Sequence, residues 1–406
     1  MNSHYVPRLI LNKFSDKLSL YNIKTGELKE NIRTDKAYAQ EDFYDDETEK
    51  KLNLRIESQF GSLLANKLLK AKDKIELSRD ELYLIKKFLL ISVIRSVGNE
   101  KFMQVEKKFY DNLAIHWEMQ GKLKGLSESE IKESTPPKPF EERQIEGETD
   151  YQYWMRTLNV ILDTNGTQEE ILKHPNKTYP AYRWSGVIMA GYLAFWDSEF
   201  KHDEFVITDI GMTSENEKGW NGITVHNQKK LKFLIDLLAK EKNKHTQMQI
   251  AKYMHSTTSF HENFQMFPIS AKRMIALIAP FYKFRQVFKE IYEMPELNTL
   301  TCLTNENLYA PNRNYCVLPQ DGLNANYHLD DKYIYDIKKL TRDETRYCNS
   351  LFMDRINTYL GFSSLTKAVG SIIKYKKLND PPYVPRNDYT NLYKTIQERY
   401  KGSLNV

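Results

Sequence analysis

The hydrophobic and polar positions of this chain repeat at helical spacing in some segments and at strand spacing in others. Apolar residues recur every three or four positions over about 47–71, including Leu52 and Leu68. The later run LYLIKKFLLISVIRSV is apolar nearly all round, which is typical of a central helix. We expect this second helix to begin at a capping box made by Ser78 and Glu81 and to end near Gly98.

Shorter elements flank these helices. KLSLYNIKTGELKENIR predicts a hairpin that turns near Gly26, and Pro7 suits the first turn of a short helix before it. VIMAGYLAFW, EFVITD, and FPIS followed by MIALIAP predict strands. Thr341 and Glu344 predict the cap of a helix through about Leu360. We therefore expect an α+β fold that is mostly helical, with a small N-terminal hairpin and a mixed or antiparallel sheet in the second half.

A change of amino-acid composition within the chain predicts a boundary between two lobes. Residues 121–150 are rich in charge and Ser and contain PPKP, which marks a solvated segment. We expect an N-terminal helical lobe with the hairpin over 1–125 and a charged, Pro-containing linker or loop over 126–150. A C-terminal α+β lobe follows over 151–406, with a Lys-rich helical insertion at about 227–255. The alternative is that both lobes form one compact domain.

Composition narrows the class of protein. The chain has 406 residues and a net charge of +5, from 59 basic and 54 acidic residues, which permits contact with nucleic acid without requiring it. Cys302, Cys316 and Cys348 form no C-x-x-C pair, which argues against a disulfide framework and a thiolate zinc site. No apolar run is long enough to span a bilayer, and the N-terminus is unlike a secretory signal. We expect a cytoplasmic protein without a membrane partner.

Several motifs resemble one family. HYVPRLILNKFS is similar to the opening of a bacterial family, catalogued as a domain of unknown function, whose members begin with His-Tyr-hydrophobic-Pro and continue to Phe-Ser. NLRIESQFGSLLANKL resembles its helix with a glutamate, here Glu57, and SVIRSVGNEKF resembles its arginine segment, here Arg95. FPIS resembles its Phe-Pro-Leu-Ser segment, and RYCNSLFMDRINTYLGFSS its closing helix with an asparagine, here Asn349. The resemblance supplies positions but no activity.

One motif departs from that family. FVITDIG lies where relatives carry Phe-x-Thr-Ser-Asp-x-Pro after a tryptophan, here Trp196. Ile207 stands in place of the Thr, Thr208 in place of the Ser and Gly211 in place of the Pro. The carboxylate of Asp209 is kept.

Four of these positions suit a hydrolase of phosphodiesters. His4 could be a general base or a nitrogen ligand, because its ordinary pKa lies near neutrality. Glu57 and Asp209 could hold Mg²⁺ or Mn²⁺, and Arg95 could stabilise negative charge on phosphoryl oxygens. We expect these four to be catalytic, with substrate binding or structural support from Tyr5, Arg8, Thr208 and Asn349.

Each candidate also has a structural interpretation. His4 could donate a hydrogen bond that fixes the terminus, with Tyr5 and Pro7 as packing. Glu57 and Arg95 could form one buried ion pair between two helices. Asp209 could be a turn residue or helix cap, and Asn349 could make an interhelical hydrogen bond.

Other known motifs are missing. The 16 glycines form no phosphate-binding loop, and no G-x-S-x-G occurs, which argues against P-loop and ordinary esterase chemistry. We therefore expect a nuclease-like hydrolase that cleaves RNA or DNA, and the resemblance implies an effector or toxin of a bacterial defence system. The alternative is a non-catalytic sensor or adaptor that binds a protein or nucleic-acid partner. Both leave open a protein activator and the oligomeric state.

Overall fold

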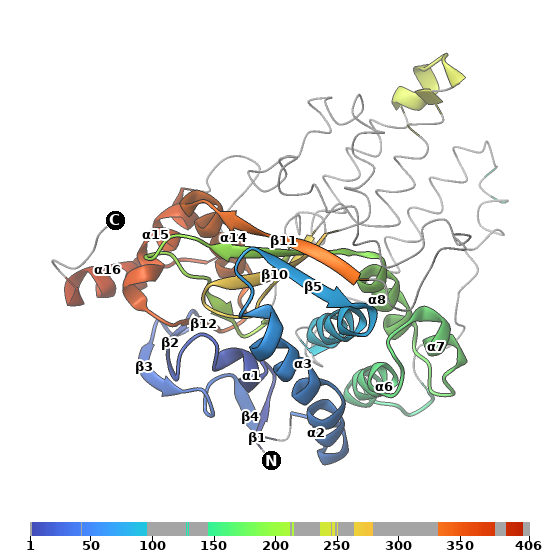
Figure 1. Cartoon of the computed structure of the whole chain (residues 1–406), viewed down its shortest axis with the longest axis horizontal. Helices are drawn as coiled ribbons and strands as arrows, with labels where there is room; N and C mark the ends of the chain where they lie inside the picture. Colours follow the sequence, from blue (N-terminus) through green and yellow to red (C-terminus); the bar gives the residue numbers. More distant parts are fainter. Residues whose placement is uncertain are drawn as a thin grey trace.

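The structure is a computed structural model of the chain, and it describes residues 2–41, 43–95, 127, 129, 145–211, 213–214, 236–244, 246–247, 250, 264–278, 332–377 and 387–400. They form an α+β fold with two large sheets, as the sequence predicts (Figure 1). Most of the predicted linker, the end of the second long helix near Gly98 and most of the Lys-rich insertion lie outside these residues. Within them, no helix is long and apolar enough to cross a membrane.

The first residues of the chain are held by a strand pairing. β1 (Asn2–His4) pairs antiparallel with β4 (Ala39–Glu41). Pro7 then occupies the N-cap of α1 (Arg8–Leu11), where its missing N–H leaves no hydrogen bond unmade. The N-terminus is therefore part of the fold from its second residue onward.

The predicted hairpin is present and belongs to a larger sheet. β2 (Lys17–Asn22) pairs antiparallel with β3 (Leu28–Arg33), and Gly26 in the turn has φ +71°. The four-stranded sheet has the order β3-β2-β12-β7, with β7 (Ile207–Thr208) and β12 (Tyr359–Phe362) contributed by the second half of the chain. The expected strand EFVITD is thus reduced to two residues.

The first long helix is continuous but contains two π-helical turns. Its parts are α2 (Asp46–Leu52), η1 (Asn53–Glu57), α3 (Ser58–Leu63) and η2 (Leu64–Leu68). After β5 (Lys74–Ser78), a second helix covers residues 79–95. The predicted capping box begins it, because the Ser78 N–H donates to Glu81 Oε2 (2.8 Å) and the Glu81 N–H donates to Ser78 Oγ (3.2 Å).

Three further helices precede the central strand of the other sheet. They are α6 (Asp150–Asp163), α7 (Gln168–Lys173) and α8 (Tyr179–Ala190), and each begins at a threonine N-cap. β6 (Tyr192–Ser198) follows at once, so the strand expected over VIMAGYLAFW is wrong for residues 187–190, which end α8. The apolar run continues across the junction, and only Gly191 separates helix from strand. A Cβ there would lie 2.7 Å from Leu277 Cγ.

The second sheet is mixed and has six strands, in the order β5-β11-β6-β10-β9-β8. Its remaining members are β8 (Thr213–Ser214), β9 (Phe264–Pro268), β10 (Arg273–Ile278) and β11 (Lys332–Leu340). β11 runs parallel to β6, and the other pairs are antiparallel. Because β5 comes from the first half of the chain, both sheets combine strands from 1–125 and from 151–406, which favours one compact domain.

The helix that begins at Thr341 is shorter than expected. α14 (Arg342–Arg355) has the predicted capping box, but it ends at Arg355 and β12 follows. Leu360 pairs with Tyr21 of β2 and with Thr208 of β7, so the sheet determines the conformation there. The chain continues with α15 (Leu365–Lys376) and α16 (Thr390–Arg399).

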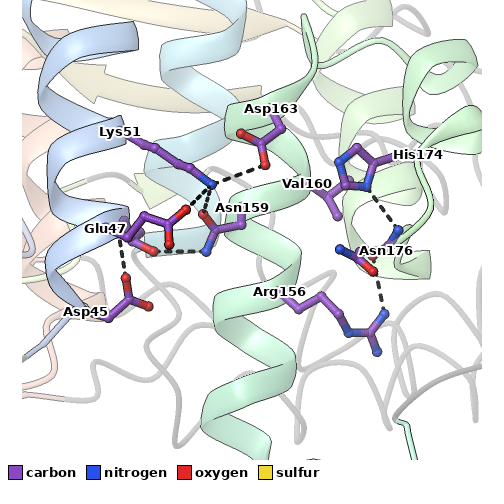
Figure 2. Close-up of a pocket in the computed structure, with 10 residues that line it drawn as sticks. Asp45, Glu47, Lys51, Arg156, Asn159, Val160, Asp163, His174 and Asn176 are labelled. Carbon is purple, nitrogen blue, oxygen red and sulfur yellow. Dashed lines mark hydrogen bonds and ion pairs between the residues drawn. The ribbon is translucent and has the colours of Figure 1, made fainter.

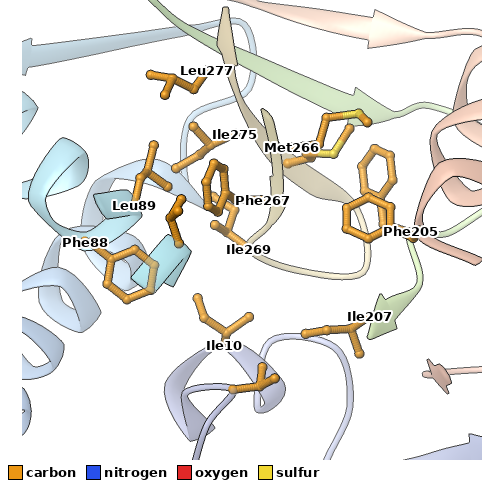
Figure 3. Close-up of a cluster of buried hydrophobic side chains, with 14 of the residues drawn as sticks. Ile10, Phe88, Leu89, Phe205, Ile207, Met266, Phe267, Ile269, Ile275 and Leu277 are labelled. Atoms are coloured by element: carbon orange, nitrogen blue, oxygen red, sulfur yellow. The ribbon is translucent and has the colours of Figure 1, made fainter. Parts of the chain in front are cut away.

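The hydrophobic core joins the sheets to the helices. Figure 3 shows Phe267 and Ile269 of the six-stranded sheet and the turn after β9, between Phe88 of the helix over 79–95 and Ile10 of α1. All four side chains are buried in one cluster that also contains Ile207 of the other sheet. Burial of this apolar surface is the main favourable term that holds the sheets against the helices.

Two consecutive lysines of the helix over 79–95 cap the ends of other helices. Lys86 Nζ donates to the Met189 carbonyl (2.5 Å) at the end of α8, and Lys87 Nζ donates to the carbonyls of Leu162 and Thr164 at the end of α6. The last carbonyls of a helix lack partners within it and carry partial negative charge, which these ammonium groups satisfy. Burial lowers the pKa of Lys87 to about 8.

Gly361 of β12 provides a test of how the two halves pack. A methyl group there would collide with the Tyr38 hydroxyl, which donates to the Ile207 carbonyl (3.0 Å). We expect Gly361→Ala to lower the free energy of unfolding by roughly 1–3 kcal/mol, because the buried strand has no room for it. The measurement is urea denaturation followed by circular dichroism.

The control is Gly61→Ala in α3, where a Cβ meets nothing within 4 Å. That change should leave stability unaltered or raise it by up to about 1 kcal/mol, because alanine favours the helix. Equal effects at the two glycines would contradict the close packing of β12 beneath Tyr38.

Candidate functional site

The buried guanidinium of Arg95 connects three parts of the N-terminal region. Its side chain is 3% exposed. Nη1 donates to Glu57 Oε1 (2.7 Å), Nε donates to Tyr44 Oη (2.8 Å), and Nη2 donates to the His4 carbonyl. Although burial opposes the charge, Tyr44 and Glu57 hold the pKa of Arg95 above its usual value. The arginine is therefore a charged group with defined acceptors in the interior.

The imidazole of His4 is half-buried beside this arginine. Its Nε2 lies 3.3 Å from the Thr34 carbonyl, which can only accept, so Nε2 must carry the proton. Nδ1 then keeps a lone pair, and no hydrogen bond to it is found among the described residues. Burial lowers the pKa of His4 and the charges of Arg8 and Arg95 act in the same direction, while the Thr34 bond and Glu57 oppose them. The lowered pKa favours the neutral imidazole at pH 7.

Asp209 binds backbone amides of the turn before β12. Its Oδ1 accepts from the N–H of Asn357 (3.0 Å), and its Oδ2 accepts from the N–H groups of Thr358 (2.6 Å) and Tyr359 (3.2 Å). Its own N–H donates to the Tyr359 carbonyl (3.1 Å). These bonds give Asp209 the turn-stabilising role that was one of its two interpretations.

Glu57 and Asp209 lie near different residues of the N-terminal segment. The charge of Glu57 raises the pKa of His4. The pKa of Tyr5 is raised mainly by burial and secondly by the charge of Asp209. Glu57 is paired with Arg95, whereas Asp209 binds the turn before β12, so the two carboxylates belong to different hydrogen-bond networks.

The described residues do not fit the metal site expected from Glu57 and Asp209. The first carboxylate is paired with Arg95, and the second accepts three backbone N–H groups. Within the described ranges, no three side chains of His, Cys, Asp or Glu are grouped so that they could hold a metal ion. The described residues therefore do not support a catalytic role for Mg²⁺ or Mn²⁺ bound by Glu57 and Asp209.

The other expected site residues are spread over the same region. Asn349 is buried in α14, where its amide accepts from the Val206 N–H (3.0 Å) and donates to the Glu204 carbonyl (2.7 Å) and to Ser371 Oγ (2.9 Å). It thereby links α14 to α15 and to the segment before β7. The remaining three residues are Thr208, buried in β7, Tyr5, packed on Tyr38 and Phe43, and Arg8, exposed in α1.

Sequence reasoning missed three members of the Arg95 cluster. Thr34 acts through its backbone carbonyl, so its side chain gives no signal. Tyr44 precedes the N-cap Asp45 and resembles any aromatic core residue. Glu49 lies one turn into α2, and burial raises the pKa of its carboxyl group while Arg95 opposes that shift. Only the tertiary structure brings Tyr44 and Glu49 to the arginine and Thr34 to His4.

A separate surface pocket of 340 Å³ lies over α6 (Figure 2). Lys51 Nζ contacts Glu47 Oε1 (3.0 Å), Asn159 Oδ1 (3.2 Å) and Asp163 Oδ2 (3.3 Å) there. None of the candidate residues lines this pocket, and its charges bind one another. We do not place an activity there.

The fold and the site define the chain as an α+β protein in which a buried arginine holds an N-terminal strand that carries a histidine. The family model described as "Protein of unknown function (DUF4238)" matches residues 2–364. The chain belongs to this family, which confirms the predicted resemblance to a domain of unknown function. Comparison with curated proteins gave no match, and comparison with solved structures gave none.

The Arg95 cluster makes a stability prediction. Arg95→Met should lower the free energy of unfolding by about 3–5 kcal/mol, because Glu57 would remain as a partly buried charge without its partner. The His4 carbonyl and the Tyr44 hydroxyl would also lose their donor. Denaturant unfolding of the purified variant measures the loss.

Arg33→Met serves as the control, because Arg33 forms an exposed ion pair with Asp35 (2.9 Å). This change should cost less than about 1 kcal/mol. If the two variants were equally stable, the Arg95 cluster would not hold the N-terminal region together.

Proposed function

We propose that this protein is a hydrolase of nucleic-acid phosphodiesters in which His4 is the general base. The observation that supports this best is the imidazole itself: its Nε2 is oriented by the Thr34 carbonyl, burial favours its neutral form, and its Nδ1 has no hydrogen-bond partner among the described residues. A neutral imidazole with a fixed orientation and a free lone pair can take a proton from an attacking water or hydroxyl.

The charge around His4 supports a phosphate-bearing substrate. Arg8 is exposed and close enough to affect the pKa of His4, and Lys36, two residues after Thr34, is also exposed. Cationic side chains of this kind contact the phosphates of RNA and DNA. Arg95 acts here as a positioning residue, because it is buried and binds the His4 carbonyl.

The non-catalytic alternative has its own support. The polar groups of Glu57, Asp209 and Asn349 bind other parts of the fold, as structural residues do. In this second proposal the chain is a sensor or adaptor, and the N-terminal segment serves only to hold the halves together. A protein partner or activator belongs to this proposal.

We also propose where such an enzyme acts. The three cysteines without motif spacing fit the cytoplasm. A role as effector or toxin of a bacterial defence system follows from the resemblance alone and stays a prediction.

Cleavage of labelled RNA and DNA tests the first proposal. Single- and double-stranded substrates are incubated with wild-type protein and with His4→Ala, each with Mg²⁺, Mn²⁺ or EDTA. We expect His4→Ala to reduce cleavage by roughly 10²–10⁴-fold, because it removes the base. His174→Ala, at another half-buried histidine, should cleave as the wild type does.

Circular dichroism and thermal unfolding show whether each variant is folded. A folded His4→Ala protein with full activity would exclude His4 as the base. No cleavage of any substrate by the wild type would overturn the hydrolase proposal and favour the adaptor.

The pH dependence of cleavage gives a further prediction. The base acts when deprotonated, and burial holds the pKa of His4 below its usual 6.5. The rate should therefore be level at pH 7 and above and should fall as the pH drops through a midpoint below 6.5. Single-turnover rates across this range provide the measurement, and a midpoint above 6.5 would contradict the assignment.

A further inference from the structure

An exposed aromatic side chain and an arginine meet at one edge of the six-stranded sheet. β6 and β11 are parallel, with Ser198 beside Leu340 at their carboxyl ends. The chain leaves both strands at this edge, and Phe200 follows one strand while Arg342 begins α14 after the other. In Figure 1, β11 leads directly into α14. The carboxyl ends of parallel strands are a common place for ligand binding.

The loop that carries Phe200 is held in place by Lys272. Lys272 Nζ donates to the carbonyls of Phe200 (2.8 Å) and Asp203 (2.5 Å). Ser198 Oγ also donates to the Asp203 carbonyl (2.7 Å), and the Asp203 N–H donates to the Phe200 carbonyl (3.1 Å). Because its backbone is fixed in this way, the loop presents its side chains with little ordering left for a ligand to impose.

The two side chains stack on one another and are both partly exposed. Phe200 is 40% exposed, and it is the one aromatic among the exposed large hydrophobic residues of the described ranges. The guanidinium carbon of Arg342 lies 5.2 Å from the centre of its ring, and the Arg342 side chain is 42% exposed. An aromatic ring beside a guanidinium provides a stacking surface for a nucleobase.

The charge of this surface is positive. Asp203 is 1% exposed beneath Arg342 (3.1 Å) and Arg346 (2.8 Å), so two arginines surround one buried carboxylate. Lys201 is exposed, and its ammonium has no partner among the described residues. Glu199 is an exposed acid of the loop. Glu204 and Asp343, the other acids next to these residues in the sequence, are paired with Lys367 and Lys374. Lys201 and Arg342 therefore outweigh Glu199 at the exposed surface. A polyanion complements this balance.

We propose that the surface formed by Phe200, Lys201 and Arg342 binds single-stranded nucleic acid, with one base stacked on the Phe200–Arg342 pair and a phosphate at Lys201. A single strand is favoured over a duplex because its unpaired bases are free to stack on an aromatic ring. None of these three residues is a hydrogen-bond partner of His4 or acts on its pKa, so the proposal goes beyond the proposed cleavage and holds for the adaptor as well.

Fluorescence anisotropy with labelled single-stranded RNA, single-stranded DNA and duplex DNA tests the proposal. The measurements use the full chain carrying His4→Ala, so that cleavage does not interfere and binding is judged independently of it. We expect the Phe200→Ala change to raise Kd for the single strands by about 5- to 150-fold, while Phe200→Trp retains wild-type binding. Lys201→Gln should raise Kd. It should also make the slope of log K against log salt concentration shallower by about one, as expected for the loss of one phosphate contact.

Two matched controls lie elsewhere on the surface. Leu172 is also 40% exposed, and Lys24 is an exposed lysine of the β2–β3 turn. Leu172→Ala and Lys24→Gln should leave Kd unchanged, and thermal unfolding checks that each variant is folded. If Phe200→Ala bound the single strands with the same Kd as Leu172→Ala, Phe200 would not be a stacking residue. The absence of single-strand binding at up to about 100 μM protein would overturn the surface altogether.

Discussion

The burial of Arg95 is the constraint on which the N-terminal half of the structure depends. A guanidinium cannot lose its charge, so its removal from water is tolerated only where anionic and polar acceptors surround it. Glu57, Tyr44 and the His4 carbonyl provide them from a helix, the loop before that helix and the first strand. The position of His4 is thus fixed by its backbone, and its ring is free for a different contact.

Buried polar side chains also join the second half of the chain to the first through hydrogen bonds to the backbone. Asp209 binds the backbone before β12, and Tyr38 donates to the Ile207 carbonyl above Gly361. Asn349 holds the segment before β7 against two helices. Each side chain satisfies backbone groups that burial would otherwise leave without partners, so the family motifs found here lie mainly where segments distant in sequence meet.

The two functional proposals use different physical properties. At His4, a neutral nitrogen with a defined tautomer is combined with nearby positive charge, which suits proton transfer next to a phosphate. At Phe200, exposed ring area and fixed positive charge suit binding without chemistry. An aromatic surface on a rigid loop and a base on a strand held by Arg95 are both preorganised, because the surrounding hydrogen bonds have already limited their movement.

The sequence by itself determined the elements whose signals are local. The capping boxes at Ser78 and Thr341, the turn at Gly26 and the periodicity after residue 47 depend on near neighbours, so they were predictable. It also indicated that His4, Glu57 and Arg95 are positions of note. The sequence offered both a catalytic and a structural interpretation for Glu57, Arg95 and Asp209, and only the tertiary structure showed that Arg95 is paired with Glu57 and that Asp209 binds the turn before β12. The tertiary structure also decided that α14 ends before a strand. These outcomes depend on which distant backbone groups need partners, and residue spacing does not contain that information.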